Sequence, residues 1–110
     1  VIGLDLSLPM LRQAQSSTTG FWSQWFKAKH HWIQADMERL PFVDASFDLV
    51  ISNCAFQWSQ SYQALWAEIK RVLKPQGALF FSTLGPDTLH ELRQAWSQVE
   101  HTPHVHDFQD

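Results

Sequence analysis

Four short apolar segments alternate with helical patterns along the chain, and this alternation constrains the fold more than any other feature. The first and last of these segments are apolar on both faces, as expected for strands covered by helices on either side. Strands that alternate with helices predict parallel pairing through right-handed crossovers. The predicted fold class is therefore α/β, with a doubly wound, mostly parallel sheet. The four predicted strands are residues 1–4, 30–35, 47–52 and 78–82.

The segment from residue 61 to residue 74 has the clearest helical pattern, because its apolar residues recur at steps of three and four. Pro75 is expected to end this helix. A second helix is expected after Ser7, which can cap it, and a third is expected to open at Pro86. The aromatic segment of residues 21–26 could form one more short helix.

Composition excludes several classes of protein. A length of 110 residues suits one small domain or part of a larger one. No apolar run approaches the roughly 20 residues that span a bilayer, so we expect no membrane partner. The net charge of −3 and the lack of a basic stripe argue against nucleic acid as a partner. Cys54 is the single cysteine, which excludes an intrachain disulfide and fits a reducing, cytoplasmic location.

Polar residues follow three of the predicted strands, and these residues are the first candidates for a binding site. They are Asp5, Asp36 and Asn53. In a parallel sheet ligands bind outside the carboxyl ends of the strands, where an acid can accept hydrogen bonds from ribose hydroxyls. A second acid could hold the amine of an adenine ring, and Met37 could offer it a soft apolar face. The alternative is that both acids are helix caps or turn formers.

Four blocks of the sequence resemble the class I S-adenosylmethionine-dependent methyltransferases. The blocks occur in the order of that family and cover most of residues 1–81; they are residues 1–14, 35–42, 47–53 and 68–77. The resemblance implies a Rossmann-like fold and S-adenosyl-L-methionine as the cofactor. It also implies that Asp5 and its neighbour Leu6 bind the ribose side, that Asp36 and Met37 flank the adenine, and that Asn53 lies near the methionine part.

The glycine-rich loop of that family, Glu-x-Gly-x-Gly-x-Gly, has no counterpart here, since the 4 glycines are scattered. The chain also opens inside an apolar run and without Met. We interpret both facts as truncation. Residues 1–110 are then a partial methyltransferase domain, incomplete at the N-terminus, without the glycine-rich first βα unit and the C-terminal part. Such a fragment is expected to lack the central strand and to be inactive alone.

A narrower resemblance points to the malonyl-[acyl-carrier protein] O-methyltransferases of biotin biosynthesis. The matching segments are residues 53–58, 80–92 and, more loosely, 106–110. The resemblance implies methyl transfer to the free carboxylate of a malonyl group on acyl carrier protein or coenzyme A. That carboxylate is already ionised at neutral pH, because its pKa is near ~4, so we expect no catalytic acid or base. Trp58, Thr83 and Gly85 are the candidates on the substrate side, with wall packing and turn geometry as the alternatives.

Other interpretations were weighed against this one. Three histidines near the C-terminus and Asp107 could hold zinc, but no helical pair or cysteine fixes their geometry, so we predict no metal site. An acidic carrier protein requires a basic docking surface. Lys27 and Lys29 could contribute to it, whereas the cations at residues 70–74 also serve a helix terminus. The alternative functions are another small-molecule O- or C-methyltransferase and a truncated, non-catalytic domain.

Overall fold

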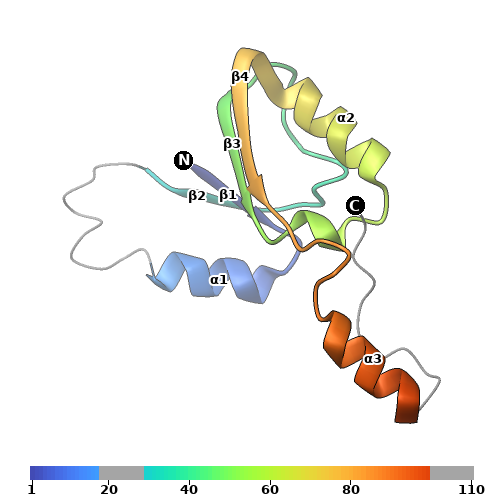
Figure 1. Ribbon diagram of the computed structural model, residues 1–110. Helices are drawn as coiled ribbons and strands as arrows, with labels where there is room; N and C mark the ends of the chain where they lie inside the picture. The colour runs from blue at the N-terminus through green and yellow to red at the C-terminus, as the bar shows by residue number, and fades with distance from the viewer. Residues whose placement is uncertain (18–28, 100–110) are drawn as a thin grey trace.

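The computed structural model describes residues 1–17 and 29–99, which form two pairs of parallel strands and three α-helices (Figure 1). Strand β1 (Ile2–Asp5) pairs with β2 (His31–Gln34), and β3 (Phe47–Asn53) pairs with β4 (Leu73–Ser82). The helices are α1 (Leu8–Ser17), α2 (Tyr62–Val72) and α3 (His90–Val99), and a short 3₁₀ helix, η2 (Phe56–Trp58), precedes α2. The expected α/β alternation and the parallel pairing are both confirmed.

The two strand pairs remain separate in the described part of the chain, where the sequence had predicted a single sheet. Figure 1 shows α1 beside β1 and β2, α2 along one side of the β3–β4 pair, and α3 away from both pairs. Strands β1 and β3 are each paired on one edge only. The same holds for β2 and β4, so both outer edges of each pair lack a neighbouring strand among the described residues.

The core lies between α2 and the β3–β4 pair. Leu65 is fully buried, and it forms a cluster with Phe56 and Ile69. Four half-buried residues pack against this cluster: Met37 from the loop after β2, Tyr62 from α2, and Leu73 and Leu79 from β4. The apolar stripe seen in the sequence is therefore the face of α2 that contacts the strands.

Helix α2 begins where the sequence predicts, because Ser61 is its N-cap and the Ser61 hydroxyl accepts a hydrogen bond from the Ala64 amide at 3.3 Å. Its expected end is wrong. The helix ends at Val72, and Leu73 already pairs with Phe47 in the next strand. Pro75 lies in an irregular part of β4, where proline is tolerated because a bulge does not need its missing N–H.

Helix α3 also differs from its expected bounds, since it begins at His90 and not at Pro86. Residues 86–89 form a turn in which the His90 amide bonds to the Asp87 carbonyl at 3.1 Å. Leu89 has a φ of 59°, which lies in the left-handed region and cannot belong to a right-handed helix. The aromatic segment of residues 21–26 lies outside the described residues.

The face of the β3–β4 pair that is turned away from α2 carries exposed apolar side chains. Leu49 is 47% exposed, Ile51 is 71% exposed and Phe80, which pairs with Ile51, is 64% exposed. Strand residues of this kind are normally covered on both faces of a parallel sheet.

No helix in the described ranges, 1–17 and 29–99, has the length and apolar character needed to cross a membrane.

Gly3 is required by the close packing of β1 against β2. It pairs with Trp32, and a Cβ at Gly3 would overlap two carbon atoms of the Trp32 ring. We expect Gly3→Ala to lower the free energy of unfolding by about 1–3 kcal/mol, as overpacking does. Urea denaturation of the full-length protein measures this. Gly85→Ala is the control, because a Cβ there meets nothing within 4 Å; equal stability of the two variants would contradict the prediction.

Candidate functional site at the strand ends

Asp5 and Asp36 lie at the carboxyl ends of two paired strands. Asp5 is the last residue of β1, and its carbonyl accepts a hydrogen bond from the Ala35 amide at 3.1 Å. Asp36 follows Ala35 directly. The Gln34 side chain donates to the Leu6 carbonyl at 2.9 Å, which ties the segment after β1 to the end of β2. Three of the predicted cofactor residues, Asp5, Leu6 and Asp36, are therefore brought together at one edge.

Each of these acids also stabilises a local turn, which was the alternative reading of both residues. Asp5 Oδ1 accepts the Ser7 amide at 2.7 Å, and Asp36 Oδ1 accepts the Glu38 amide at 2.8 Å. A carboxylate has about four acceptor positions on its two oxygens, so one such hydrogen bond leaves capacity for a ligand. The turn fixes the direction of each carboxylate and leaves its other acceptor positions available for a ligand.

Met37 and Asn53, the other two predicted cofactor residues, lie after β2 and at the end of β3. Met37 is half-buried and packs against the core cluster of Phe56, Leu65 and Ile69, so its position is fixed by packing. Asn53 ends β3 and is exposed, and its Oδ1 accepts the Ser82 hydroxyl at 2.5 Å.

The backbone changes direction immediately after Asn53, at the end of β3. Cys54 has a φ of 50°, an uncommon value for a residue with a side chain. Its amide donates to the Ser82 carbonyl at 3.0 Å, which closes the end of β3 onto β4. This corner lies directly beside Asn53, at the carboxyl ends of β3 and β4.

The candidates on the substrate side follow η2 and β4. Trp58 is the last residue of η2 and is 62% exposed. Thr83 and Gly85 are exposed and follow β4. The Thr83 hydroxyl donates to Gln57 Oε1 at 3.3 Å, and Gln57 is only 6% exposed. The sequence analysis did not name Gln57 as a site residue. Gln57 directly precedes Trp58 in the segment on which the narrower resemblance rests.

Glu38 was also missed, although it stands two residues after Asp36. Its Oε1 accepts hydrogen bonds from the Ser59 hydroxyl and from the Gln60 and Ser61 amides. These bonds, the Ser59 hydroxyl first, lower the pKa of the Glu38 carboxyl below its usual value. The signal in the sequence was an acid beside the predicted adenine residues and a polar, serine-rich segment before a helix.

Glu68 and Arg71 on α2 hold the loop that follows Glu38. Arg71 donates to both carboxylate oxygens of Glu68 at 2.8 Å, and this hydrogen bonding lowers the pKa of Glu68 and raises the pKa of Arg71. Glu68 also accepts the Leu40 amide at 2.8 Å. Arg71 donates further to the carbonyls of Leu40 and Phe42, at 3.0 and 2.7 Å. The loop is thus attached to α2 by side chains and by its own backbone.

Two basic side chains at the end of α2 and the start of β4 form ion pairs within the chain. Arg71 additionally pairs with Asp44 at 3.0 Å, and Lys74 pairs with Asp48 at 3.0 Å. Both cations are therefore engaged in ion pairs within the chain. Lys27 lies outside the described residues.

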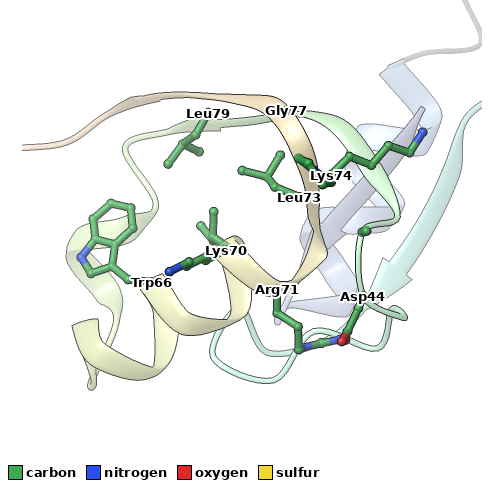
Figure 2. Close-up of a pocket in the computed structure, with 11 residues that line it drawn as sticks. Asp44, Trp66, Lys70, Arg71, Leu73, Lys74, Gly77 and Leu79 are labelled. Atoms are coloured by element: carbon green, nitrogen blue, oxygen red, sulfur yellow. The ribbon is translucent and has the colours of Figure 1, made fainter.

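A hollow of about 590 Å³ lies under the C-terminal half of α2 (Figure 2). Trp66 and Arg71 of α2 line it together with Leu73, Gly77 and Leu79 of β4. This is the amino end of the β3–β4 pair, so the hollow lies at the edge opposite to Asn53. It is not the site that the sequence predicts.

Within residues 1–17 and 29–99 no three His, Cys, Asp or Glu side chains come together as metal ligands would. The histidines of the C-terminal segment and Asp107 lie outside the described residues.

Comparison with known families now places this geometry. A family described as a methyltransferase domain matches residues 1–81, which contain β1 to β3, β4 except for its last residue, and all but two of the predicted site residues. The chain belongs to this methyltransferase domain family. The match covers the turns after β1, β2 and β3, but it ends one residue before the end of β4.

Several members of the family are similar to this chain over most of its length. A malonyl-[acyl-carrier protein] O-methyltransferase of Legionella pneumophila is 40% identical over 110 residues, covering 100% of this chain and 37% of that protein. The biotin biosynthesis bifunctional protein BioHC of Teredinibacter turnerae is 45% identical over 105 residues, covering 96% of this chain and 18% of that protein. The chain therefore spans less than half the length of these relatives.

A solved structure supports the fold assignment. The crystal structure of an S-adenosylmethionine-dependent methyltransferase from Mesorhizobium loti is 31% identical and superposes with a TM-score of 0.65, covering 78% of this chain and 37% of that one. The predicted class I methyltransferase fold is confirmed by this likeness together with the parallel strand pairs.

Proposed function

We propose that this domain belongs to an S-adenosyl-L-methionine-dependent methyltransferase that methylates the free carboxylate of a malonyl group carried by acyl carrier protein, in biotin biosynthesis. The observation that carries the proposal is the placement of Asp5 and Asp36 at adjacent carboxyl ends of one parallel pair, within a chain of the methyltransferase domain family. The names of the relatives support the malonyl acceptor.

The side chains at this edge suit a nucleoside with an attached amino acid. In the proposal Asp5 accepts hydrogen bonds from the ribose hydroxyls, and Leu6 lies beside them. Asp36 accepts a hydrogen bond from the adenine amine, and Met37 packs against the ring, as a soft and adaptable side chain can. Asn53 binds the methionine part. Two fixed carboxylates that accept hydrogen bonds and a half-buried thioether that packs against the ring are what such a ligand needs, so the residues present fit the cofactor.

The cofactor would supply an electrophilic methyl group on its sulfonium. The residues of this chain have no proton to move, because the malonyl carboxylate is already ionised at neutral pH. Their task is to orient the acceptor, which can contribute about 7–11 kcal/mol to lowering a barrier, and to exclude water. Trp58 is proposed to cover the acceptor, while Thr83, held by Gln57, and Gly85 shape the other side.

The complete domain is proposed to contain a glycine-rich first βα unit before residue 1 and a further C-terminal part. The unpaired edges of β1 and β3 support this, since one parallel strand between them would join the two pairs into one sheet. The exposed side chains of Leu49 and Ile51 would then acquire neighbours. The length of the relatives is consistent with both additions. The proposal also places the protein in the cytoplasm, where an exposed thiol such as Cys54 stays reduced.

The test uses the full-length protein and two measurements. Calorimetric titration should show binding of S-adenosylhomocysteine, and a methyl-transfer assay should show methylation of malonyl-acyl carrier protein. Acetyl-acyl carrier protein is the matched control acceptor, because it lacks the free carboxylate and should remain unmodified. Absence of S-adenosylhomocysteine binding would reject the methyltransferase assignment. Binding without transfer to malonyl thioesters would reject the acceptor and favour another O- or C-methyltransferase.

A further inference from the structure

Glu38 forms the densest set of hydrogen bonds to a single oxygen atom outside the predicted site residues. Its Oε1 accepts the Ser59 hydroxyl at 2.6 Å, the Gln60 amide at 2.5 Å and the Ser61 amide at 2.8 Å. Two consecutive backbone amides and a hydroxyl converge on this oxygen, an arrangement that favours a negative charge. The charged carboxylate therefore holds a segment that is 21–23 residues away in the sequence.

The backbone of Glu38 is itself fixed by the predicted adenine residues. Its amide donates to Asp36 Oδ1 at 2.8 Å, and Met37 between them packs against the core cluster. A displacement of Glu38 would therefore move the two side chains that are proposed to contact the adenine ring.

The segment that Glu38 holds, residues 59–61, begins directly after Trp58, a predicted residue of the substrate side. Trp58 ends η2, and the Ser59 amide bonds to the Phe56 carbonyl at 3.0 Å. Ser59 is thus fixed on one side by η2 and on the other by Glu38. One carboxylate joins the turn of the adenine residues to the turn that carries Gln57 and Trp58.

We infer that Glu38 is a positioning residue that sets the adenine side and the acceptor side of the site relative to each other. This inference rests on the proposed function. Glu38 does not touch either ligand in this account. It acts through Met37 on one side and through Trp58 on the other, so its loss should weaken the binding of both ligands together.

A purely structural role must be separated from this one, because Glu38 also lies at the N-terminal end of α2. A carboxylate at that position stabilises a helix through its unpaired amides and its dipole. Ser61→Ala is the matched control. It removes the hydroxyl cap on the Ala64 amide, and it leaves the Ser61 amide that Glu38 binds. The control therefore weakens the start of α2 while keeping the connection.

The experiment compares Glu38→Ala, Glu38→Gln and Ser61→Ala in the full-length protein. The measurements are the Kd for S-adenosylhomocysteine, the KM and kcat for malonyl-acyl carrier protein, and the Tm of each variant. We expect Glu38→Ala to raise both the Kd and the KM and to lower kcat, with a loss of roughly 10- to 100-fold in kcat/KM, because misplaced groups lose both contact with the ligands and orientation of the acceptor. Glu38→Gln should recover part of both losses, because its side-chain oxygen still accepts hydrogen bonds.

Ser61→Ala should lower the Tm through loss of the cap and leave the Kd and KM within about twofold of the wild type, because the Ser61 amide that Glu38 binds is kept. If Ser61→Ala raises Kd and KM as much as Glu38→Ala does, Glu38 acts only by stabilising α2 and the inference is overturned. Unchanged Kd and KM in Glu38→Ala would overturn it as well. Failure of the wild type to bind S-adenosylhomocysteine would instead count against the proposed function itself.

Discussion

Asp5→Ala is expected to weaken the binding of S-adenosylhomocysteine to the full-length protein by roughly 30- to 900-fold, which corresponds to about 2–4 kcal/mol. The reason is that a charged carboxylate would lose its hydrogen bonds to the two ribose hydroxyls, and hydrogen bonds to charged groups are about twice as strong as neutral ones. Isothermal titration calorimetry measures the loss directly.

Two further variants make this result specific. Asp48→Ala removes an exposed carboxylate at the amino end of β3, where it pairs with Lys74 and is far from the strand ends that bind ligand, so the Kd should not change. Asp5→Asn keeps an oxygen that can accept the Ser7 amide and so preserves the turn. Full affinity in Asp5→Asn would mean that Asp5 serves the turn alone and would remove it from the ribose site.

Leu65→Ala is expected to lower the free energy of unfolding by about 2–5 kcal/mol, the range for deleting a fully buried leucine side chain. Leu65 has 0% exposure and lies at the centre of the cluster between α2 and β4. The cavity that alanine leaves would border Met37, so the loss should be accompanied by weaker cofactor binding. Urea denaturation gives the free energy, and calorimetry gives the Kd.

Val43→Ala is the control for this loss of core packing. Val43 is 79% exposed, so its substitution should change the free energy of unfolding by no more than about 0.5 kcal/mol. A Leu65→Ala variant as stable as Val43→Ala would show that this cluster does not hold α2 on the β3–β4 pair.

The alternation of elements and the start of α2 were predictable, because apolar period and capping chemistry are local properties of the sequence. The Ser61 cap and the apolar stripe that contains Leu65 can both be recognised from the sequence of the helix itself. The end of α2 was not predictable in the same way. Leu73 has an acceptable helical spacing, but pairing with Phe47 outweighs it, and that contact joins residues distant in sequence. Leu89 was missed for a related reason, since nothing in the sequence announces a left-handed backbone at a leucine.

The candidate site was predictable as far as it follows from strand ends. Asp5, Asp36 and Asn53 could be placed because parallel strands end at one edge. Glu38 and Gln57 could not be placed, because their importance comes from partners more than 20 residues away, Ser59 and Thr83. Side-chain connections between loops depend on how the loops fold back, and no periodic pattern records that.

The loop after Asp36 is attached to α2 at two points, at the N-cap Ser61 through Glu38 and at Glu68, in the second half of the helix, through Leu40. The partners on the helix are seven residues apart, from 61 to 68, which is about 10 Å along the axis at 1.5 Å per residue. Only Arg39 separates Glu38 from Leu40 in the loop. An insertion or deletion at this point would detach one end of the loop from its partner. Natural variation in the length of this domain should therefore occur in other segments, and the spacing from Asp36 to Leu40 should stay constant.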